Sequence, residues 1–288
     1  MFEQLGLIGC GLMGGSFALA VKRAGLVKRV VGYSKSPTTT ERAKRLNVID
    51  VTAPSALLAV SGADLVLVAV PVAESESTFK AIRHGLSPDT LIMDVGSTKS
   101  DVIEAARRGL VDQLGSFVPA HPIAGKEKAG VEHAEAGLFA DRQVVLTPIK
   151  ATLRSNVQRA TQIWTGIGAR VMMLSPDEHD SAFAAVSHLP HLLAFALTNA
   201  IAAQPQGERF LGLAGPGFRD FSRIAASDPI VWRDILLANR GHLLQQSQAF
   251  RHALGEFEAL LAAGDAQALE AAIALASRTR SQWQPSGA

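Results

Sequence analysis

The chain has 288 residues, enough for one large or two ordinary domains with a substantial core. Apolar residues make up 48% and charged residues 19%, a composition that excludes a largely disordered protein. The formal net charge is only +2 and the two signs are mixed along the chain, so nothing indicates a nucleic-acid partner or a membrane surface.

The single cysteine and the first residues of the chain indicate in which cellular compartment we expect the protein. Cys10 is the only cysteine, which excludes an internal disulfide and fits a reducing compartment. The chain opens on a strand without a basic, apolar leader, so we expect no secretory signal. The most apolar stretch, Leu189–Ala203, is broken by polar residues and is expected to be too short to span a bilayer. These features predict a cytoplasmic protein.

The first predicted element is a short apolar strand, Leu5–Ile8, that runs into Gly-x-Gly-x-x-Gly and then into a helix expected from Ser16 to Ala24. In this motif the first glycine allows a tight turn, the second exposes backbone to a pyrophosphate, and the third brings helix and strand together. The positive start of the helix then holds the phosphates. The predicted dinucleotide contacts are Gly9, Gly11, Leu12, Met13, Gly14, Ser34, Lys35, Ser36, Val70 and Pro71.

The end of the second strand, Lys28–Tyr33, governs cofactor choice. NAD-specific sites usually have Asp or Glu there, which hydrogen-bonds to the ribose hydroxyls. This chain has Ser34, Lys35 and Ser36 instead, and two hydroxyls with an ammonium suit a 2′-phosphate. The pattern favours NADP, with NAD or the use of both cofactors as the alternative.

The first half of the chain alternates strands and helices, the pattern of a parallel sheet covered on both faces. Strands are predicted where apolar runs are short and continuous, and helices where they are amphipathic. The further strands are 48–51, 63–70, 91–95, 117–119, 143–147 and 169–174, and the further helices are 39–45, 101–110 and 152–166.

From Ser175 the character of the sequence changes. Ser175 followed by Pro176, Asp177 and Glu178 is typical of a capped helix start. Strand signals then vanish, and Ala and Leu recur at helical spacing to about residue 277. So much apolar helix surface suggests a dimerisation domain. We therefore expect a dinucleotide-binding domain at 1–174 and a helical substrate and dimerisation domain at 175–288.

Polar residues in distinctive places are candidates for catalysis. His121 and Ser97 each follow a predicted strand, at the edge where ligands bind in this architecture, and His121 could take a proton from a substrate hydroxyl. Both could also serve only a turn or a helix cap. His188 and His191 share a helix face beside Pro190; we find no third ligand and predict no metal. The other histidines, 84, 133, 179, 242 and 252, are expected to be surface or cap residues.

The segment 215–223 interrupts the helical half with glycine and proline, and we expect it to be a loop. It carries Arg219, Asp220 and Arg223 within an apolar domain, which suggests binding of a carboxylated ligand. A solvated connection between helices is the alternative.

Together these motifs resemble the prephenate dehydrogenase family, including its arogenate and cyclohexadienyl variants. The matching stretches occur in the family's order and span nearly the whole chain: 9–14, 94–99, 121–127, 187–191, and 217–223 running on to 228–234. The resemblance implies an α/β, Rossmann-type dinucleotide-binding domain followed by an all-α dimerisation domain, with the substrate in the cleft between them. It also implies a homodimer that oxidatively decarboxylates prephenate or arogenate with NADP or NAD.

The resemblance further implies roles for individual residues. His121 would accept a hydrogen bond from the substrate's ring hydroxyl, assisted by Ser97. Arg223 would bind a substrate carboxylate, and the remaining pocket positions would be Glu127, His188, His191, Asp220 and Trp232. The family's NAD-using members carry an acid where this chain has Ser34. The chain therefore differs from those members at the position that governs cofactor preference.

Two other readings compete with this one. Another two-domain dehydrogenase, of the β-hydroxyacid or pyrroline-carboxylate reductase type, shares the glycine loop. The former uses a lysine on its first interdomain helix, whereas the last lysine here is Lys150. A non-catalytic NADP-sensing protein is the second alternative, but it would not need Ser97, His121, His188 and Arg223 together.

Overall fold

The computed structural model describes residues 1–126 and 128–284. The N-terminal half is built on a parallel sheet of six described strands in the order β3-β2-β1-β4-β5-β6. The strands are β1 (Phe2–Ile8), β2 (Val27–Tyr33), β3 (Val51–Thr52), β4 (Leu65–Val68), β5 (Leu91–Asp94) and β6 (Phe117–Val118). The order reverses between β1 and β4, which opens a crevice at their carboxyl ends where such folds bind dinucleotides.

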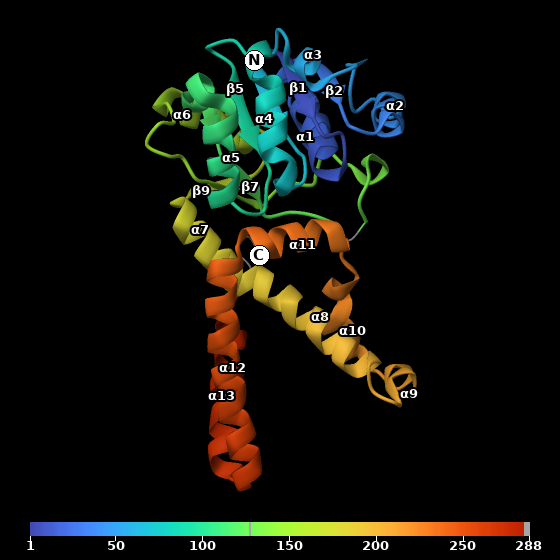
Figure 1. The fold of residues 1–288 in the computed structure, drawn as a ribbon, viewed down its shortest axis with the longest axis vertical. Helices are drawn as coiled ribbons and strands as arrows, with labels where there is room; N and C mark the ends of the chain where they lie inside the picture. Colours follow the sequence, from blue (N-terminus) through green and yellow to red (C-terminus); the bar gives the residue numbers. More distant parts are fainter. Residues whose placement is uncertain (127, 285–288) are drawn as a thin grey trace.

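Helices cover both faces of this sheet, as predicted (Figure 1). They are α1 (Leu12–Arg23), α2 (Pro37–Arg45), α3 (Ala56–Val60), α4 (Ser75–Ile82), α5 (Ser100–Leu110) and α6 (Arg154–Gly166). One face is filled by Trp164 between Phe17 and Phe139, with ring centroids 5.0 and 5.3 Å away, and the other by Phe79 against Phe117. Helix α1 begins four residues earlier than expected because the glycine loop itself enters the first turn.

A second, smaller sheet contains β7 (Ala120–Pro122), β8 (Gln143–Leu146) and β9 (Arg170–Met173). Strand β8 pairs antiparallel with β7 and parallel with β9. His121 follows β6 of the parallel sheet, as predicted, but it lies within β7 of the smaller sheet, which the sequence did not indicate. The chain leaves β6 at Pro119, which has no N–H to donate to the ladder, and re-forms a strand in the other sheet.

The C-terminal half is helical, and no strand follows β9 among the described residues. The predicted capped helix start at Ser175 is confirmed, and Ser175 and Glu178 form a capping box there at the start of α7. The helices are α7 (Pro176–Phe183), α8 (Leu189–Ala202), α9 (Gly207–Gly212), α10 (Pro216–Ser222), α11 (Pro229–Ala238), α12 (Arg240–Ala263) and α13 (Ala266–Gln282). Helix α11 lies across the carboxyl edge of the N-terminal half, and α12 and α13 project away as a long hairpin (Figure 1).

Helices α7 and α8 are continuous through a π-helical turn at Ala184–His188, just before Pro190. The combined helix, Pro176–Ala202, has 27 residues and a mean hydropathy of 1.3 in its most apolar window, of which 17% is buried. By length and composition alone it could cross a bilayer, so the expectation that this region is too short was wrong. The helix is longer than the apolar stretch because it runs without a break from Pro176, and the π-helical turn accommodates Pro190.

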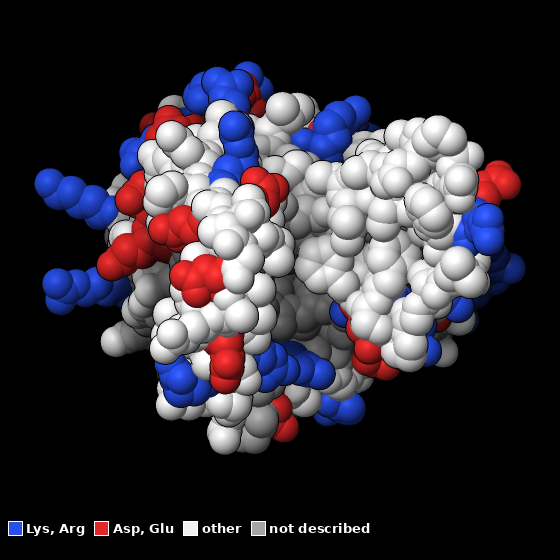
Figure 2. Space-filling view, turned by 90° about the horizontal axis from the view of Figure 1, so that it is seen from below, with Lys and Arg blue, Asp and Glu red and all other residues white. Residues whose placement is uncertain are grey.

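Apolar side chains crowd the outside of the helical half. Helix α13 has no buried residue in the isolated chain, and Figure 2 shows broad uncharged areas on the face seen from below. The exposed apolar residues of this half are Val186, Leu197, Phe210, Leu211, Leu213, Phe221, Ile230, Val231, Leu237, Leu244, Phe250, Leu254, Leu261, Ile273, Leu275 and Trp283. A surface of this kind usually contacts another protein surface.

Candidate active site

The three motif glycines have different roles at the end of β1. Gly9 has a φ of +94°, and a Cβ there would lie 2.2 Å from the Ala69 carbonyl oxygen. A Cβ on Gly14 would lie 2.1 Å from the carbonyl oxygen of Gly9, whereas one on Gly11 would meet nothing within 4 Å. Gly9 and Gly14 therefore shape the turn, and Gly11 leaves open space. No side chain caps α1, so its first N–H groups are available to phosphates.

A cavity of about 480 Å³ opens beside this loop. Its lining includes Gly9, Gly11, Ser34, Lys35, Val70 and Pro71 of the predicted contacts. Ser34 Oγ accepts a hydrogen bond from the Cys10 N–H at 2.8 Å, which ties β2 to the glycine loop. Burial raises the pKa of the Cys10 thiol to about 11, against a smaller opposing effect of Ser34, so this thiol is not a nucleophile.

The same cavity contains a carboxylate that the sequence did not reveal. Glu74, in the 3-10 turn Val72–Glu74 after β4, forms an ion pair with Lys35 and also contacts the Ser77 hydroxyl. The hydrogen bond from Lys35 lowers the pKa of Glu74. A negative charge thus lies beside the Ser34–Ser36 segment although β2 itself ends without an acid.

A second cavity of about 450 Å³ extends from the first toward α11, and the two cavities together form a cleft. It shares Gly11, Ala69, Val70 and Pro71 with the first. Its lining also includes Leu12, Met13, Ser97, Lys126 and Trp232. Of the predicted cofactor contacts, Gly14 and Ser36 line neither cavity. The cleft therefore joins the glycine loop, the end of β5 and a helix of the C-terminal half.

A buried ion pair fixes the backbone next to His121. Lys99 Nζ lies 2.5 Å from Asp94 Oδ2 and donates to the Ala120 carbonyl at 2.8 Å, while the Ala120 N–H donates to Asp94 Oδ1 at 2.9 Å. Lys99 and Asp94 are 0% and 3% exposed. This clamp locks the start of β7 to the segment that contains Ser97.

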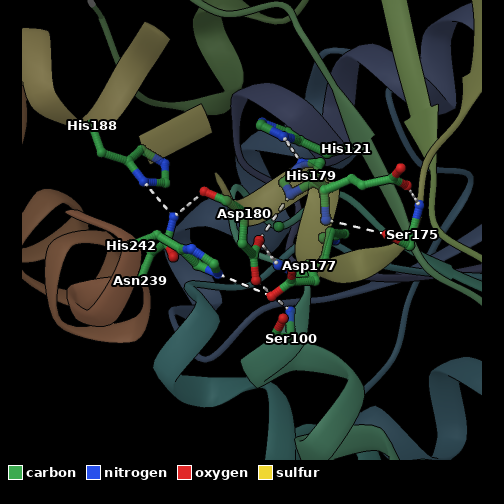
Figure 3. Close-up of polar contacts among 12 residues, drawn as sticks. Ser100, His121, Ser175, Asp177, His179, Asp180, His188, Asn239 and His242 are labelled. Atoms are coloured by element: carbon green, nitrogen blue, oxygen red, sulfur yellow. Dashed lines mark hydrogen bonds and ion pairs between the residues drawn. The ribbon is translucent and has the colours of Figure 1, made fainter. Parts of the chain in front are cut away.

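Three side chains form a chain of hydrogen bonds that ends at His121 (Figure 3). His121 Nδ1 lies 2.8 Å from His179 Nε2, and His179 Nδ1 lies 2.8 Å from Asp180 Oδ1. Asp180 also accepts the N–H groups of Lys99 and Ser100, at 2.8 Å each. The expectation that His179 is a surface or cap residue was wrong, since it is 0% exposed.

The pKa shifts along this chain determine which nitrogens hold protons. Burial alone would raise the pKa of Asp180, but hydrogen bonds from His179, Ser100 and Lys99 overcome it and lower the pKa to about 2. Burial lowers the pKa of His179, so a neutral His179 donates from Nδ1 to the carboxylate and accepts at Nε2. His121 must then donate from Nδ1, which leaves the lone pair on its Nε2.

His121 itself is held neutral. Burial lowers its pKa well below the usual value, and the proximity of His179, Lys99 and His188, whose protonated forms would repel a protonated His121, lowers it further. Phe183 packs against the rings of both His121 and His179, at centroid distances of 4.8 and 4.5 Å. The arrangement presents an unprotonated ring nitrogen that can accept a proton near neutral pH.

In the helical half, histidine and aromatic side chains gather around Trp232, which lines the second cavity. His188 is 1% exposed, and its Nδ1 lies 3.1 Å from the amide nitrogen of Asn239. His191 donates from Nδ1 to the Ser187 carbonyl at 2.9 Å and stacks on Trp232, with ring centroids 3.4 Å apart. Burial lowers the pKa of His191, the Ser187 carbonyl raises it, and the Arg223 charge lowers it further. His188, His191, Trp232 and Arg223 therefore form one cluster.

The predicted loop at 215–223 is mostly helix α10, because Pro216 at its first turn starts a helix well. Asp220 is exposed on α10 and pairs with Arg219 at 3.1 Å. Arg223 is exposed at the start of the 3-10 turn Arg223–Ala226. Glu127 lies outside the described residues. Among the described residues no group of three or more His, Cys, Asp or Glu side chains is placed to hold a metal ion.

Comparison with known proteins gives a consistent result along the chain. Residues 17–173 match the family described as prephenate dehydrogenase, nucleotide-binding domain, and residues 175–275 match prephenate dehydrogenase, dimerization domain. The chain is 37% identical to prephenate dehydrogenase of Bacillus subtilis over 85% of its own length and 67% of that protein. It is 34% identical to cyclohexadienyl dehydrogenase of Zymomonas mobilis over 92% and 90% of the two lengths.

A solved structure extends the similarity to three dimensions. Prephenate dehydrogenase from A. aeolicus, in complex with hydroxyphenyl propionate and NAD+, superposes with a TM-score of 0.91. The alignment has 34% identity and covers 98% of each chain.

Proposed function

This chain belongs to the prephenate dehydrogenase family, and from that premise we propose which of its residues perform the reaction and which cofactor it prefers. It is an NAD(P)-dependent oxidoreductase that oxidatively decarboxylates prephenate or arogenate in tyrosine biosynthesis. The single observation that best supports the proposed roles is the Asp180–His179–His121 chain, which leaves the Nε2 nitrogen of His121 unprotonated.

In the proposed mechanism His121 Nε2 accepts a hydrogen bond from the C4 hydroxyl of the substrate ring. A bound nicotinamide ring would take up the hydride that leaves C4. As the hydride leaves, the hydroxyl becomes carbonyl-like and its proton shifts toward His121. The ring carboxylate then departs as CO₂, the electron pair of its bond enters the ring, and the oxygen recovers the proton as the ring becomes a phenol.

The other residues would hold the substrate in position. We assign to Ser97, which lines the cleft cavity, a hydrogen bond to the same substrate hydroxyl. Arg223 would bind a carboxylate, since a guanidinium offers paired donors to its two oxygens. His188, His191 and Trp232 would line the pocket, with Glu127 and Asp220 at its mouth. Geometric support is strongest for His191 and Trp232, whose rings stack.

For the cofactor, we propose a preference for NADP through Ser34, Lys35 and Ser36. The ammonium of Lys35 is the one cation of this segment, and it is 73% exposed. Its ion pair with Glu74 opposes the preference, because a 2′-phosphate would have to draw Lys35 away from that carboxylate and approach a like charge. A related structure contains NAD+. The competition for Lys35 therefore decides how strong the preference is.

The remaining proposals concern organisation. The helical region matches a dimerization domain, and we propose that it forms a homodimer that buries the exposed apolar residues of α8 to α13. We place the boundary between the two domains at 174 and 175. We also propose that the protein is cytoplasmic and that the apolar helix Pro176–Ala202 packs against protein rather than lipid.

The direct test measures reduced-nicotinamide formation with prephenate and arogenate, each combined with NADP+ and NAD+. We expect turnover with at least one substrate and a higher kcat/KM with NADP+. A higher kcat/KM with NAD+ would contradict the cofactor proposal alone. No turnover in any combination, from folded protein that binds cofactor, would contradict the proposed function.

A further inference from the structure

Asn239 lies at the junction of α11 and α12, is 4% exposed, and does not itself line the cleft. Its amide nitrogen donates to the Asp180 backbone carbonyl at 2.7 Å and lies 3.1 Å from His188 Nδ1 (Figure 3). A backbone carbonyl can only accept, so the amide atom facing it must be the nitrogen and not the oxygen.

The amide nitrogen has two protons and no available lone pair. One proton goes to the Asp180 carbonyl, and the other points to His188 Nδ1. His188 Nδ1 must therefore be unprotonated, because two donors cannot share a hydrogen bond. A neutral histidine that accepts at Nδ1 holds its proton on Nε2.

We propose that Asn239 is a positioning residue that fixes His188 as an Nε2–H donor toward a substrate oxygen. The oxygen would belong to a carboxylate or a keto group, the acceptors that a neutral N–H can satisfy. This inference rests on the proposed function for the identity of the ligand. The tautomer assigned to His188 does not depend on the proposed function.

The position of the second nitrogen fits a ligand-facing donor. Nε2 of His188 forms no hydrogen bond with any described residue. The atom is also not fully buried, so a ligand atom can reach it. The His188 ring meets the edge of Trp232 at 6.2 Å, and Trp232 lines the cleft. Burial lowers the pKa of His188 to about 4, against the raising effect of Asp180, and the charges of His179 and His191 lower it further, so the ring is neutral at pH 7.

Asp180 thereby gives two histidines opposite states. Its carboxylate acts through His179 to leave a lone pair on Nε2 of His121. Its carbonyl acts through Asn239 to leave a proton on Nε2 of His188. His121 can then accept a hydrogen bond at Nε2 and His188 can donate one from Nε2, without a charge on either ring.

Nitrogen-15 NMR of histidine-labelled full-length protein reads the tautomer directly, with the His188 signals assigned from their loss in His188→Ala. We expect wild-type His188 to be protonated on Nε2 and not on Nδ1. In Asn239→Asp a carboxylate faces Nδ1, and we expect Nδ1 to become protonated. The control is Asn156→Asp, which alters another buried asparagine, on α6, whose amide contacts the Gly115 carbonyl. It should leave the His188 signals unchanged.

Kinetics provide the second measurement. Asn239→Ala should lower kcat/KM about 10-fold or more, because a buried acceptor on His188 loses its donor. In the His188→Ala background the same change should have almost no further effect, since Asn239 would have nothing left to orient. Asn156→Ala should have no kinetic effect in either background.

Two results would overturn the proposal: wild-type His188 protonated on Nδ1, or an Asn239→Ala effect that persists undiminished in His188→Ala. If the Asn239 variants do not fold, the wild-type tautomer alone decides. If the wild-type protein turns over neither prephenate nor arogenate, the proposed function fails while the tautomer is still measured.

Discussion

Replacing Asp180 by Asn tests the chain that orients His121. The carboxylate accepts three N–H groups, from His179, Lys99 and Ser100, whereas an amide of the same shape has only one oxygen. If the amide oxygen turns to Ser100, the NH₂ group faces His179 Nδ1 and forces the His179 proton onto Nε2. His179 then donates to His121 Nδ1, and the His121 proton moves to Nε2, where the substrate hydroxyl needs an acceptor.

The loss of this acceptor should lower kcat by roughly 10²–10⁴, the usual contribution of a positioned general base. Stability should also fall. A pKa lowered to about 2 corresponds to ~2 kcal/mol of stabilisation, which is fully present above the unfolded pKa near 4 and is lost as the pH falls toward 2. Asn cannot supply this contribution at any pH.

The assay is kcat and KM for the substrate across pH, with the melting temperature of each variant. Asp177→Asn is the matched control, because it makes the same chemical change on the same helix at a side chain that is 86% exposed. It should leave kcat unchanged. A folded Asp180→Asn protein with wild-type kcat and an unchanged pH profile would refute the orientation of His121 by this chain.

Four further predictions follow from the cleft and its charges. Gly11→Ala should raise the KM for the cofactor about tenfold or more without changing the melting temperature, because the added Cβ meets only open space in the protein. Gly14→Ala should instead destabilise the fold by ~1–3 kcal/mol, because its Cβ would clash with the backbone. Equal melting temperatures for the two variants would contradict this prediction. Glu74→Gln should raise the ratio of kcat/KM with NADP+ to kcat/KM with NAD+ roughly fivefold, because it frees Lys35. The control Glu76→Gln, on α4 outside the cavity, should leave this ratio unchanged. An unchanged ratio in Glu74→Gln would show that Glu74 does not affect cofactor selection. Arg223→Ala should mainly raise the substrate KM, about 30-fold or more for a lost carboxylate contact worth ~2–4 kcal/mol, and a fall confined to kcat would argue against that role. The acid limb of kcat/KM should lie below pH 6.5, since burial and neighbouring charges lower the pKa of His121, and a limb above pH 7 would show that it titrates as an ordinary histidine.

Local patterns in the sequence were sufficient for the glycine turn and the parallel strands of the dinucleotide half. The glycine motif, the strand before it and the helix after it lie within about 20 residues, so their spacing alone predicts the turn that Gly9 and Gly14 form. The capped helix start at Ser175 was predicted for the same reason. Features of this kind depend on neighbours along the chain.

The missing parts of the site depend on contacts between distant residues. His121 and His179 are 58 positions apart, and Asn239 and His188 are 51 apart. Glu74 lies 39 positions from Lys35. No periodicity marks such pairs in a single sequence. The one local signal was that His179 and Asp180 are adjacent in the first turns of a capped helix. Two neighbouring titratable residues at this place could have indicated a polar contact with the sheet edge.

The central claim is that His121 takes the substrate's proton in the transition state, and His121→Asn tests it most directly. Steady-state rates of reduced-nicotinamide formation should show kcat lower by orders of magnitude, with the substrate KM almost unchanged. A folded variant that retains wild-type kcat, or that loses activity only through a higher KM, would contradict the claim.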